Sequence, residues 1–122
     1  MTKKQWLERA FYLNEEIQQL KIAKDLAVQM NDVADGNAKG YKEYTRMLFK
    51  KIDELLNISK EITEAISKVE NPTYRTLLTA RYINFKKWTE VAEDMEIDLR
   101  WMYRLRKRAL EELTVDNYCI NS

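Results

Sequence analysis

Apolar residues recur every three or four positions through the first thirty residues of the chain. The series is Trp6, Ala10, Leu13, Ile17, Leu20, Ala23, Ala27 and Met30. This spacing places the residues on one face of a helix and predicts a single long amphipathic helix. Because a helix rises ~1.5 Å per residue, this one would extend for roughly 40 Å and would need a partner along its length.

A second stripe of the same kind follows a short segment that contains both glycines of the chain. The segment 31–40 is predicted to be a loop. The stripe after it has a mean spacing of 3.5 residues, the coiled-coil value, and consists of Tyr41, Tyr44, Leu48, Ile52, Leu55, Ile58, Ile62, Ile66 and Val69. Two long helices joined by a loop most simply form an antiparallel hairpin, which we expect over residues 1–70.

Five further apolar residues lie off these two stripes: Leu7, Phe11, Ile22, Leu26 and Met47. They indicate a second packing surface, covered either by the C-terminal region or by another subunit. The alternative is that they only widen the intramolecular stripe. A homodimer is therefore one candidate assembly.

The dipeptide Asn71-Pro72 marks the boundary between two parts of the chain. Asn71 is suited to cap a helix and Pro72 to occupy its first position, where the missing N–H costs nothing. Three short helices are predicted after it, at about 72–83, 89–95 and 99–113. The expected organisation is a helical hairpin over 1–70, a DNA-binding domain over 71–113 and a flexible tail over 114–122.

Composition and charge agree with a helical protein and single out one segment. Two glycines and one proline in 122 residues are too few for a sheet protein with many tight turns. The expected fold is therefore all-α, with a long antiparallel coiled-coil-like hairpin followed by a three-helix domain. Lys and Arg number 21 against 20 Asp and Glu, but residues 99–110 carry five basic side chains and no acid. That segment forms a local basic face.

Several classes of chemistry are not expected. The chain has no histidine and one cysteine, Cys119, so neither Ser-His nor Cys-His catalysis, a disulfide nor a cysteine-based metal site is expected. Its acidic pairs are adjacent in sequence and diverge on a helix. We expect no catalytic residues, metal, cofactor or small-molecule substrate. No segment approaches the ~20 apolar residues of a membrane span, so we expect no membrane association and a cytoplasmic location.

Residues 88–105 have the pattern of a helix-turn-helix motif. Two helices that cross steeply over a tight turn need apolar side chains at fixed positions. Those positions hold Val91, Met95, Ile97, Met102 and Leu105, and the small residue required at the close approach is Ala92. Asp98 is suited to cap the second helix. Glu96 departs from the pattern, because this turn position favours glycine and positive φ.

The second helix of the motif is the candidate recognition helix. With its apolar residues facing the core, its other face could enter a major groove. The candidate base-reading residues are Leu99, Arg100, Trp101, Tyr103 and Arg104. The candidate phosphate contacts are Lys86, Lys87, Arg106, Lys107 and Arg108. Trp101 could instead pack on the N-terminal hairpin, and the whole motif could be a helical hairpin whose only role is packing.

A closer resemblance covers residues 72–113. The residues that carry it are Leu78-Thr79-Ala80-Arg81-Tyr82, Trp88 to Ala92, Asp98 to Arg104 and Lys107 to Leu113. This region resembles region four of bacterial sigma factors, in which the recognition helix reads a promoter element through its early residues. The usual Arg-Glu at the helix start is Leu99-Arg100 here, which implies another base preference. With its helical N-terminal half, the chain is similar to small phage-encoded regulators of the ArpU and RinA type.

Three functions are compatible with this reading. The first is a transcription regulator that binds double-stranded DNA in the cytoplasm of a bacterial host. The second is a phage DNA-packaging protein like a small terminase subunit, which would assemble as a ring. The third is an adaptor that docks on RNA polymerase and does not bind DNA by itself.

Overall fold

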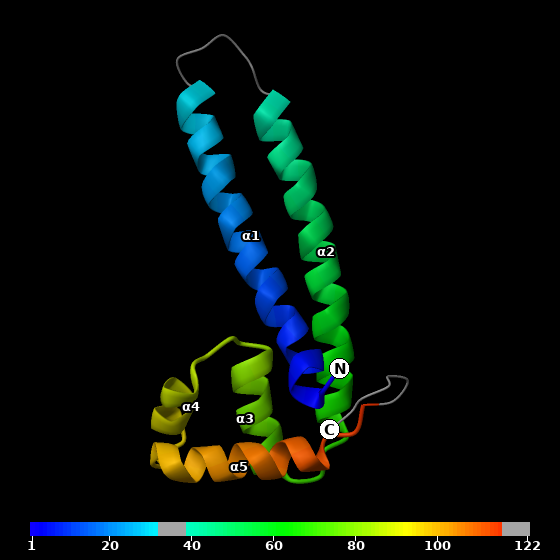
Figure 1. Cartoon of the computed structure of the whole chain (residues 1–122), viewed down its shortest axis with the longest axis vertical. Coiled ribbons are helices and arrows are strands. Elements are labelled where there is room, and N and C mark those ends of the chain that lie inside the picture. The colour runs from blue at the N-terminus through cyan, green and yellow to red at the C-terminus, as the bar shows by residue number, and fades with distance from the viewer. Residues whose placement is uncertain (32–38, 116–122) are drawn as a thin grey trace. The chain divides into compact units, whose positions relative to one another are not determined.

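The computed structural model describes residues 1–31 and 39–115, and five helices make up most of this part of the chain (Figure 1). They are α1 (Lys3–Asn31), α2 (Lys39–Ser67), α3 (Pro72–Tyr82), α4 (Trp88–Asp94) and α5 (Leu99–Glu112). The described residues contain no strand. The all-α prediction is therefore confirmed, with two long helices followed by three short ones.

The predicted loop and tail are only partly open to comparison. α2 begins at Lys39, so Gly40 lies inside a helix and not in the predicted loop. The rest of that loop, 32–38, lies outside the described residues, and so does the tail from 116 onward, including Cys119.

The chain divides into two compact units. The first combines the start of α1 with everything from the end of α2 onward, Met1–Phe11 and Ile58–Ser122, and we call it the helix-turn-helix unit. The second is Tyr12–Asn57, the hairpin unit. These units divide the chain within the two long helices, after Phe11 and after Asn57. The predicted domain boundary between residues 70 and 71 stays a prediction.

The helix-turn-helix unit has a well-filled core to which all five helices contribute. Trp6, Leu7 and Ala10 of α1 are buried in it. So are residues from the end of α2 and from the three short helices: Ile62, Ala65, Ile66, Val69, Leu77, Leu78, Tyr82, Val91, Ala92, Met102, Leu105, Ala109 and Leu113. Phe11 lies with its ring edge-on to Phe85, at a centroid distance of 5.3 Å. The off-stripe residue Phe11 thus packs on the C-terminal region, and Leu7 is buried in the core of the same unit.

In both units the segments of α1 and α2 run antiparallel. Arg9 Nη2 lies 2.9 Å from Glu61 Oε2 in the helix-turn-helix unit. In the hairpin unit, Lys51 Nζ lies 2.9 Å from Glu16 Oε2, and the Lys24 ammonium lies 5.1 Å from the Tyr41 ring centroid. Residues later in α1 are thus paired with residues earlier in α2, as a hairpin requires.

The hairpin unit buries few of its side chains. Among its described residues only Leu13, Ile17 and Leu48 are buried hydrophobic side chains. Met30 and Tyr41, which the stripes placed in the core, are exposed, and so are Ile22, Leu26 and Met47. Two helices can bury only the strip along which they touch, so these side chains are not buried by the described part of the chain.

Helix starts follow their local sequence. Thr2 and Gln5 form a reciprocal capping pair at the start of α1, in which each backbone N–H donates to the side-chain oxygen of the other residue. Asn71 caps α3 by accepting from the N–H groups of Thr73 and Tyr74, with Pro72 at the first position. The prediction for Asn71-Pro72 is confirmed.

Candidate nucleic-acid interface

α4 and α5 are joined by a turn whose backbone is fixed by hydrogen bonds. The N–H of Glu96 donates to Glu93 O and the N–H of Ile97 donates to Ala92 O, both at 3.0 Å. This pair of bonds is the Schellman motif, which requires a residue with positive φ after the helix end. Glu96 is that residue, with φ 57°. The expected departure from glycine is therefore found at the position that the pattern indicated.

The start of α5 is capped as the sequence predicts. Asp98 Oδ1 accepts from the backbone N–H of Trp101 at 2.8 Å. The carboxylate also lies at the positive end of the helix, where a negative charge is favourable. Val91, Ala92, Met102 and Leu105 are buried between the two helices, while Met95 and Ile97 are half-buried. The packing of a helix-turn-helix is thus present in the described residues.

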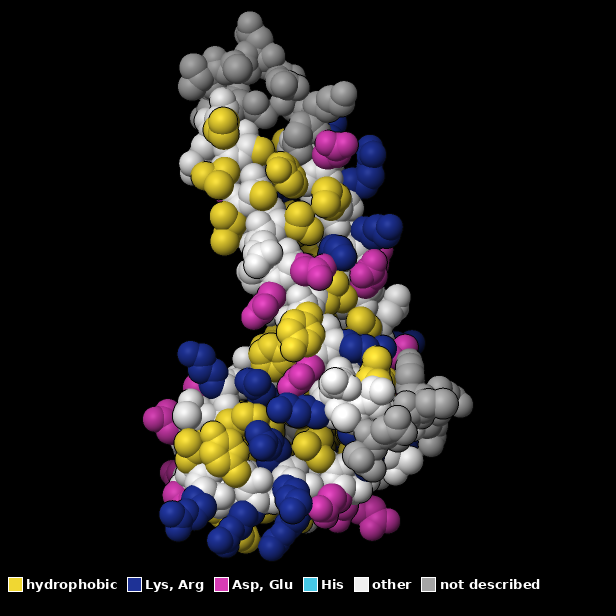
Figure 2. Space-filling view, viewed as in Figure 1, with side chains coloured by type: hydrophobic (Ala, Val, Ile, Leu, Met, Phe, Trp, Pro, Cys, Tyr) yellow, Lys and Arg dark blue, Asp and Glu magenta, His cyan; other side chains and the backbone are white. Residues whose placement is uncertain are grey.

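The outer face of α5 is basic and aromatic. Six of the predicted DNA contacts are exposed on it: Arg100, Trp101, Tyr103, Arg104, Lys107 and Arg108. Leu99 is half-buried at the helix start. Figure 2 shows Lys and Arg side chains in a row along α5, with acidic side chains gathered at one end of it. The acids of this helix are Glu111 and Glu112, in its last turn. The face therefore offers positive charge and ring surface over about two and a half turns.

Trp101 lies on this basic face. The Arg108 guanidinium carbon lies 5.3 Å from the Trp101 ring centroid, so the two side chains are held together on the face. A guanidinium over an indole ring is an attractive contact that orders both groups. Trp101 thus contacts a residue of its own helix on the exposed face of α5, and both roles that the sequence left open for it stay predictions.

A stack of cations and rings lies beside the motif, and the sequence did not indicate it. Trp88 is flanked by two guanidinium groups, those of Arg81 and Arg106, each 5.7 Å from the Trp88 ring centroid. Arg81 also lies 4.2 Å from the Phe11 ring centroid and donates to the carbonyl oxygen of Lys86. These contacts tie α1, α3, α4 and α5 together within the helix-turn-helix unit.

Arg106 is held differently from the other predicted phosphate contacts. It is half-buried, and besides Trp88 its guanidinium contacts the ring of Tyr103 at 5.1 Å. Its charge therefore lies beside the exposed face, ordered by two aromatic rings. Tyr103, a predicted base-reading residue, is in turn positioned by Arg106.

Lys86 and Lys87, also predicted to contact phosphate, have different surroundings. Lys86 Nζ lies 2.6 Å from Asp94 Oδ2 of α4. This hydrogen bond, together with the charge of Asp94, raises the pKa of Lys86, so the group stays cationic. Lys87 is exposed at the N-terminal boundary of α4. Because Asp94 partly neutralises Lys86, Lys87 is the better placed of the two to bind an anion.

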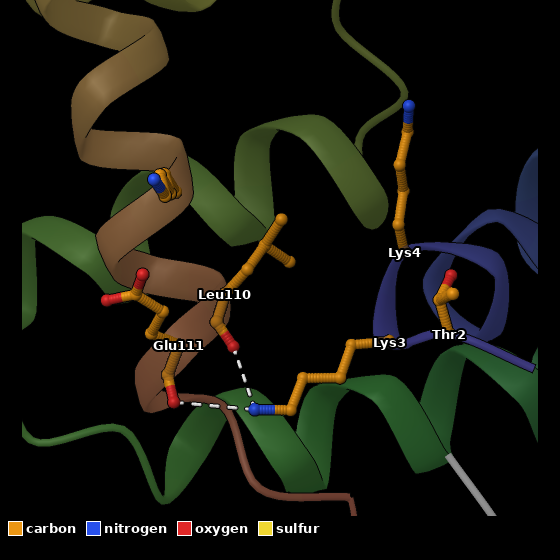
Figure 3. Close-up of a pocket in the computed structure, with 6 residues that line it drawn as sticks. Thr2, Lys3, Lys4, Leu110 and Glu111 are labelled. Atoms are coloured by element: carbon orange, nitrogen blue, oxygen red, sulfur yellow. Dashed lines mark hydrogen bonds between the residues drawn. The ribbon is translucent and has the colours of Figure 1, made fainter. Parts of the chain in front are cut away.

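Lys3 fixes the far end of α5. Its ammonium donates to the carbonyl oxygens of Leu110 and Glu111, at 3.1 and 3.4 Å (Figure 3). A cation at the C-terminal carbonyl groups satisfies acceptors that the helix leaves free and complements its negative end. Residues separated by more than a hundred positions are joined here, so no local pattern could have indicated the contact.

Tyr82 closes the core behind the motif. Its side chain is buried and its ring lies edge-on to Trp88, at a centroid distance of 6.1 Å. Burial raises the pKa of Tyr82 to about 12, because the phenolate would lose its hydration there. The neighbouring Arg81 and Arg106 oppose this shift with their positive charges. The hydroxyl group of Tyr82 thus stays protonated and uncharged at neutral pH.

Two negative observations apply to the described ranges. In residues 1–31 and 39–115, no group of three or more carboxylate or cysteine side chains is placed to hold a metal ion. Within the same ranges, no helix is both long enough and apolar enough to cross a membrane.

The chain belongs to the family described as "Protein of unknown function (DUF1492)", whose profile matches residues 41–114. The match covers more than half of the chain and includes all of α3, α4 and α5. No curated protein and no solved structure matches the chain.

Proposed function

We propose that this protein is a transcription regulator that binds double-stranded DNA through α5. One observation carries the proposal. The exposed face of α5 presents four cations and two aromatic rings with no acid before its last turn, on a helix held by a helix-turn-helix. A helix fixed in this way can lie in a major groove and present its early side chains to base edges.

The proposed contacts divide along the length of α5. Arg100, Tyr103 and Arg104 lie in its first half, where side chains of a recognition helix reach base edges. An arginine there would donate two hydrogen bonds to a guanine, the commonest specific contact in the major groove. Trp101 and Leu99 would add apolar contacts to thymine methyl groups or sugars. Base readout would thus come from the part of the helix that begins at the Asp98 cap.

Phosphate contacts would come from the second half of α5 and from the start of α4. Lys107 and Arg108 are exposed cations beyond the base-reading turn, and Lys87 lies at the boundary of α4. Contacts of this kind fix the register of the protein on the duplex but carry no base specificity. Arg106 and Lys86 would contribute less, since each is engaged with neighbouring side chains.

The resemblance of residues 72–113 to region four of sigma factors supports this proposal and narrows it. In that region the recognition helix binds a promoter element, and small phage-encoded regulators of the ArpU and RinA type share such a helix. We therefore propose a phage or prophage regulator that acts in the cytoplasm of a bacterial host, with RNA polymerase as a candidate further partner.

Fluorescence anisotropy across a salt series tests the proposal. The wild type is titrated against a mixed-sequence duplex beside the triple variant Arg104→Ala, Lys107→Ala, Arg108→Ala. Each phosphate that the protein neutralises contributes roughly −0.9 to the slope of log K against log salt. The triple variant should therefore bind more weakly, with a slope smaller by about two to three.

A second triple variant provides the matched control. Lys42, Arg46 and Lys50 are exposed on α2 and follow one another at single-turn spacing, so changing all three to Ala removes the same charge elsewhere. This variant should keep the wild-type slope. Absence of wild-type binding at low salt would overturn the proposal and favour the polymerase adaptor. An equal loss in both variants would show that charge alone, and not α5, accounts for binding.

A further inference from the structure

Arg106 is placed differently from the other cations of α5. Its side chain is half-buried. The exposed cations of the helix are Arg100, Arg104, Lys107 and Arg108. Met102 and Ala109, which precede and follow Arg106 by about one turn, are both buried. Arg106 therefore lies at the edge of the core and not at the centre of the exposed face.

Two aromatic rings hold the guanidinium group of Arg106. Its central carbon lies 5.7 Å from the Trp88 ring centroid and 5.1 Å from the Tyr103 ring centroid. Both distances are within the range of attractive contacts between a cation and a ring. Trp88 begins α4, whereas Tyr103 belongs to α5. Arg106 thus connects a ring of the exposed face to the first helix of the motif.

Trp88 is itself fixed by the core of the helix-turn-helix unit. Its ring lies edge-on to buried Tyr82, and the Arg81 guanidinium carbon lies 5.7 Å from its centroid. Burial raises the pKa of Tyr82, and the positive charges of Arg81 and Arg106 oppose this rise. The charge of Arg106 therefore acts on the core as well as on the surface. The contact with Tyr103 is supported from behind by ordered side chains.

Tyr103 lies among the proposed DNA contacts and is 43% exposed. Arg100 precedes it by three residues and Lys107 follows it by four, positions that are adjacent on a helix surface. An exposed side chain without a partner can occupy more than one rotamer. A side chain that is ordered before binding loses less conformational entropy when it contacts a ligand. The contact with Arg106 gives Tyr103 this advantage.

We propose that Arg106 is a positioning residue, which holds the Tyr103 ring for contact with a base and does not itself bind phosphate. This role rests on the proposed DNA binding by α5. It differs from the sequence prediction, which assigned Arg106 to phosphate. A cation that binds phosphate has to extend to the DNA backbone, whereas the guanidinium of Arg106 lies between two rings at the edge of the core.

Tyr103 can contact a base edge in two ways. Its ring can pack on a thymine methyl group, and its hydroxyl can donate or accept a hydrogen bond. Both contacts depend on the direction in which the ring points. Attraction between a cation and phosphate depends much less on direction and carries no base specificity. Loss of Arg106 should therefore weaken the binding of a preferred sequence and spare the binding of other sequences.

Fluorescence anisotropy with two duplexes tests this role. One duplex is enriched by the wild type from a randomised pool, and the other has a mixed sequence. Arg106→Gln should bind the enriched duplex about three- to tenfold more weakly, as expected for the loss of one contact between a cation and a ring. It should bind the mixed-sequence duplex like the wild type, with the same slope of log K against log salt. In a Tyr103→Ala background, Arg106→Gln should have no further effect on either duplex.

Arg108→Gln is the matched control, because it removes the same group from the exposed face of the same helix. As a proposed phosphate contact, Arg108 should contribute to both duplexes, and its loss should reduce the salt slope by roughly 0.9. The loss should also add to that of Tyr103→Ala. If Arg106→Gln behaves in this way, the positioning role is overturned and DNA binding by α5 stands. If the wild type binds neither duplex, the proposed function is overturned and this role with it.

Nuclear magnetic resonance of the full chain without DNA tests the contact by itself. Arg106→Gln should shift the ring resonances of Tyr103. Arg108→Gln should leave them in place, because residues five positions apart point in different directions from a helix. Unchanged Tyr103 resonances in Arg106→Gln would overturn the positioning role. Far-UV circular dichroism checks that the variants are folded. Arg106→Lys keeps the charge but not the planar group, and it should give the same effects at smaller size.

Discussion

The helix-turn-helix unit and the hairpin unit are built from the same two long helices, yet they differ in how much they bury. Where α1 passes through the first unit, Trp6, Leu7 and Ala10 are all buried; where it passes through the second, Ile22, Leu26 and Met30 are exposed. The difference is the number of neighbours, since α3 and α5 add further surface only in the first unit. A helix pair becomes a packed core when a third helix covers its second side.

This difference has a consequence for function. The side chains proposed to contact DNA are carried by a unit whose core fixes α5 at both ends. Asp98 caps its start and Lys3 binds the carbonyl groups near its end. Binding sites on such supported elements hold their geometry, because little order has to be gained on binding. In the sparsely packed hairpin unit, in contrast, apolar side chains of α1 such as Leu26 and Met30 stay exposed.

The comparison is tested most strongly by matched truncations in the two cores. Leu78 is fully buried in the helix-turn-helix unit, and Leu48 is the only buried leucine of α2 in the hairpin unit. Leu78→Ala should cost about 3–5 kcal/mol, because a closed core leaves a cavity. Leu48→Ala should cost about 2 kcal/mol or less, since the site is open enough to collapse.

Urea unfolding followed by two signals separates these effects. Trp6, Trp88 and Trp101 all lie in the helix-turn-helix unit, so tryptophan fluorescence reports on that unit, whereas far-UV circular dichroism reports on both. Leu78→Ala should shift both transitions. Equal shifts for the two variants would contradict the difference in packing between the units.

A smaller effect is expected from Tyr82 at alkaline pH. Burial raises its pKa to about 12, above the value near 10 of an unfolded chain. The folded state thus binds this proton more tightly, and the stability it contributes is complete below pH 10 and is lost as pH rises from 10 to 12. The loss should reach up to about 3 kcal/mol.

Tyr82→Phe removes this titration and keeps most of the ring packing. The free energy of unfolding of the wild type should fall relative to that of the variant between pH 10 and 12, as measured by urea titrations at each pH. If the free energies of unfolding of the two proteins change equally between pH 10 and 12, Tyr82 is not protected from ionisation. The core around its side chain would then be accessible to water.

The smallest expected effect concerns the turn of the motif. Glu96 has positive φ, which costs a residue with a Cβ atom about 1 kcal/mol. Glu96→Gly should therefore stabilise the helix-turn-helix unit by about 0.5–1 kcal/mol, measured by tryptophan fluorescence in urea. Phe85 has φ 58° as well, but its ring contacts Phe11, so Phe85→Gly should destabilise. A destabilised Glu96→Gly variant would contradict the assignment of strain.

Local patterns predicted the features that depend on neighbouring residues. Asn71 and Asp98 cap helices, and Glu96 takes up positive φ, because hydrogen bonds within a few positions decide each of these conformations. The exposure of Arg100, Arg104 and Lys107 followed from the apolar face of the same helix. These are short-range effects that a single sequence contains in full.

Contacts between distant segments were not predictable in the same way. The position of Arg81 between Phe11 and Trp88 requires three segments to meet. The contact of Lys3 with the end of α5 joins opposite ends of the chain. Similarly, the stripe that predicted Met30 and Tyr41 as core residues gave their helical face correctly but not the number of helices available to cover it.

Selection from a pool of randomised duplexes tests most directly the claim that α5 reads DNA sequence. The wild type, Arg100→Ala and Arg108→Ala are each used to enrich bound duplexes, which are then sequenced. Arg100 lies in the proposed base-reading turn, and Arg108 is a proposed phosphate contact on the same helix. The two variants therefore lose equal charge from one element.

The account predicts that the wild type enriches a defined motif. Arg108→Ala should enrich the same motif with weaker binding, whereas Arg100→Ala should lose the preference at one position, at a cost of about 1–3 kcal/mol for the favoured base. No enriched motif with the wild type, or an unchanged motif with Arg100→Ala, would contradict sequence reading by α5.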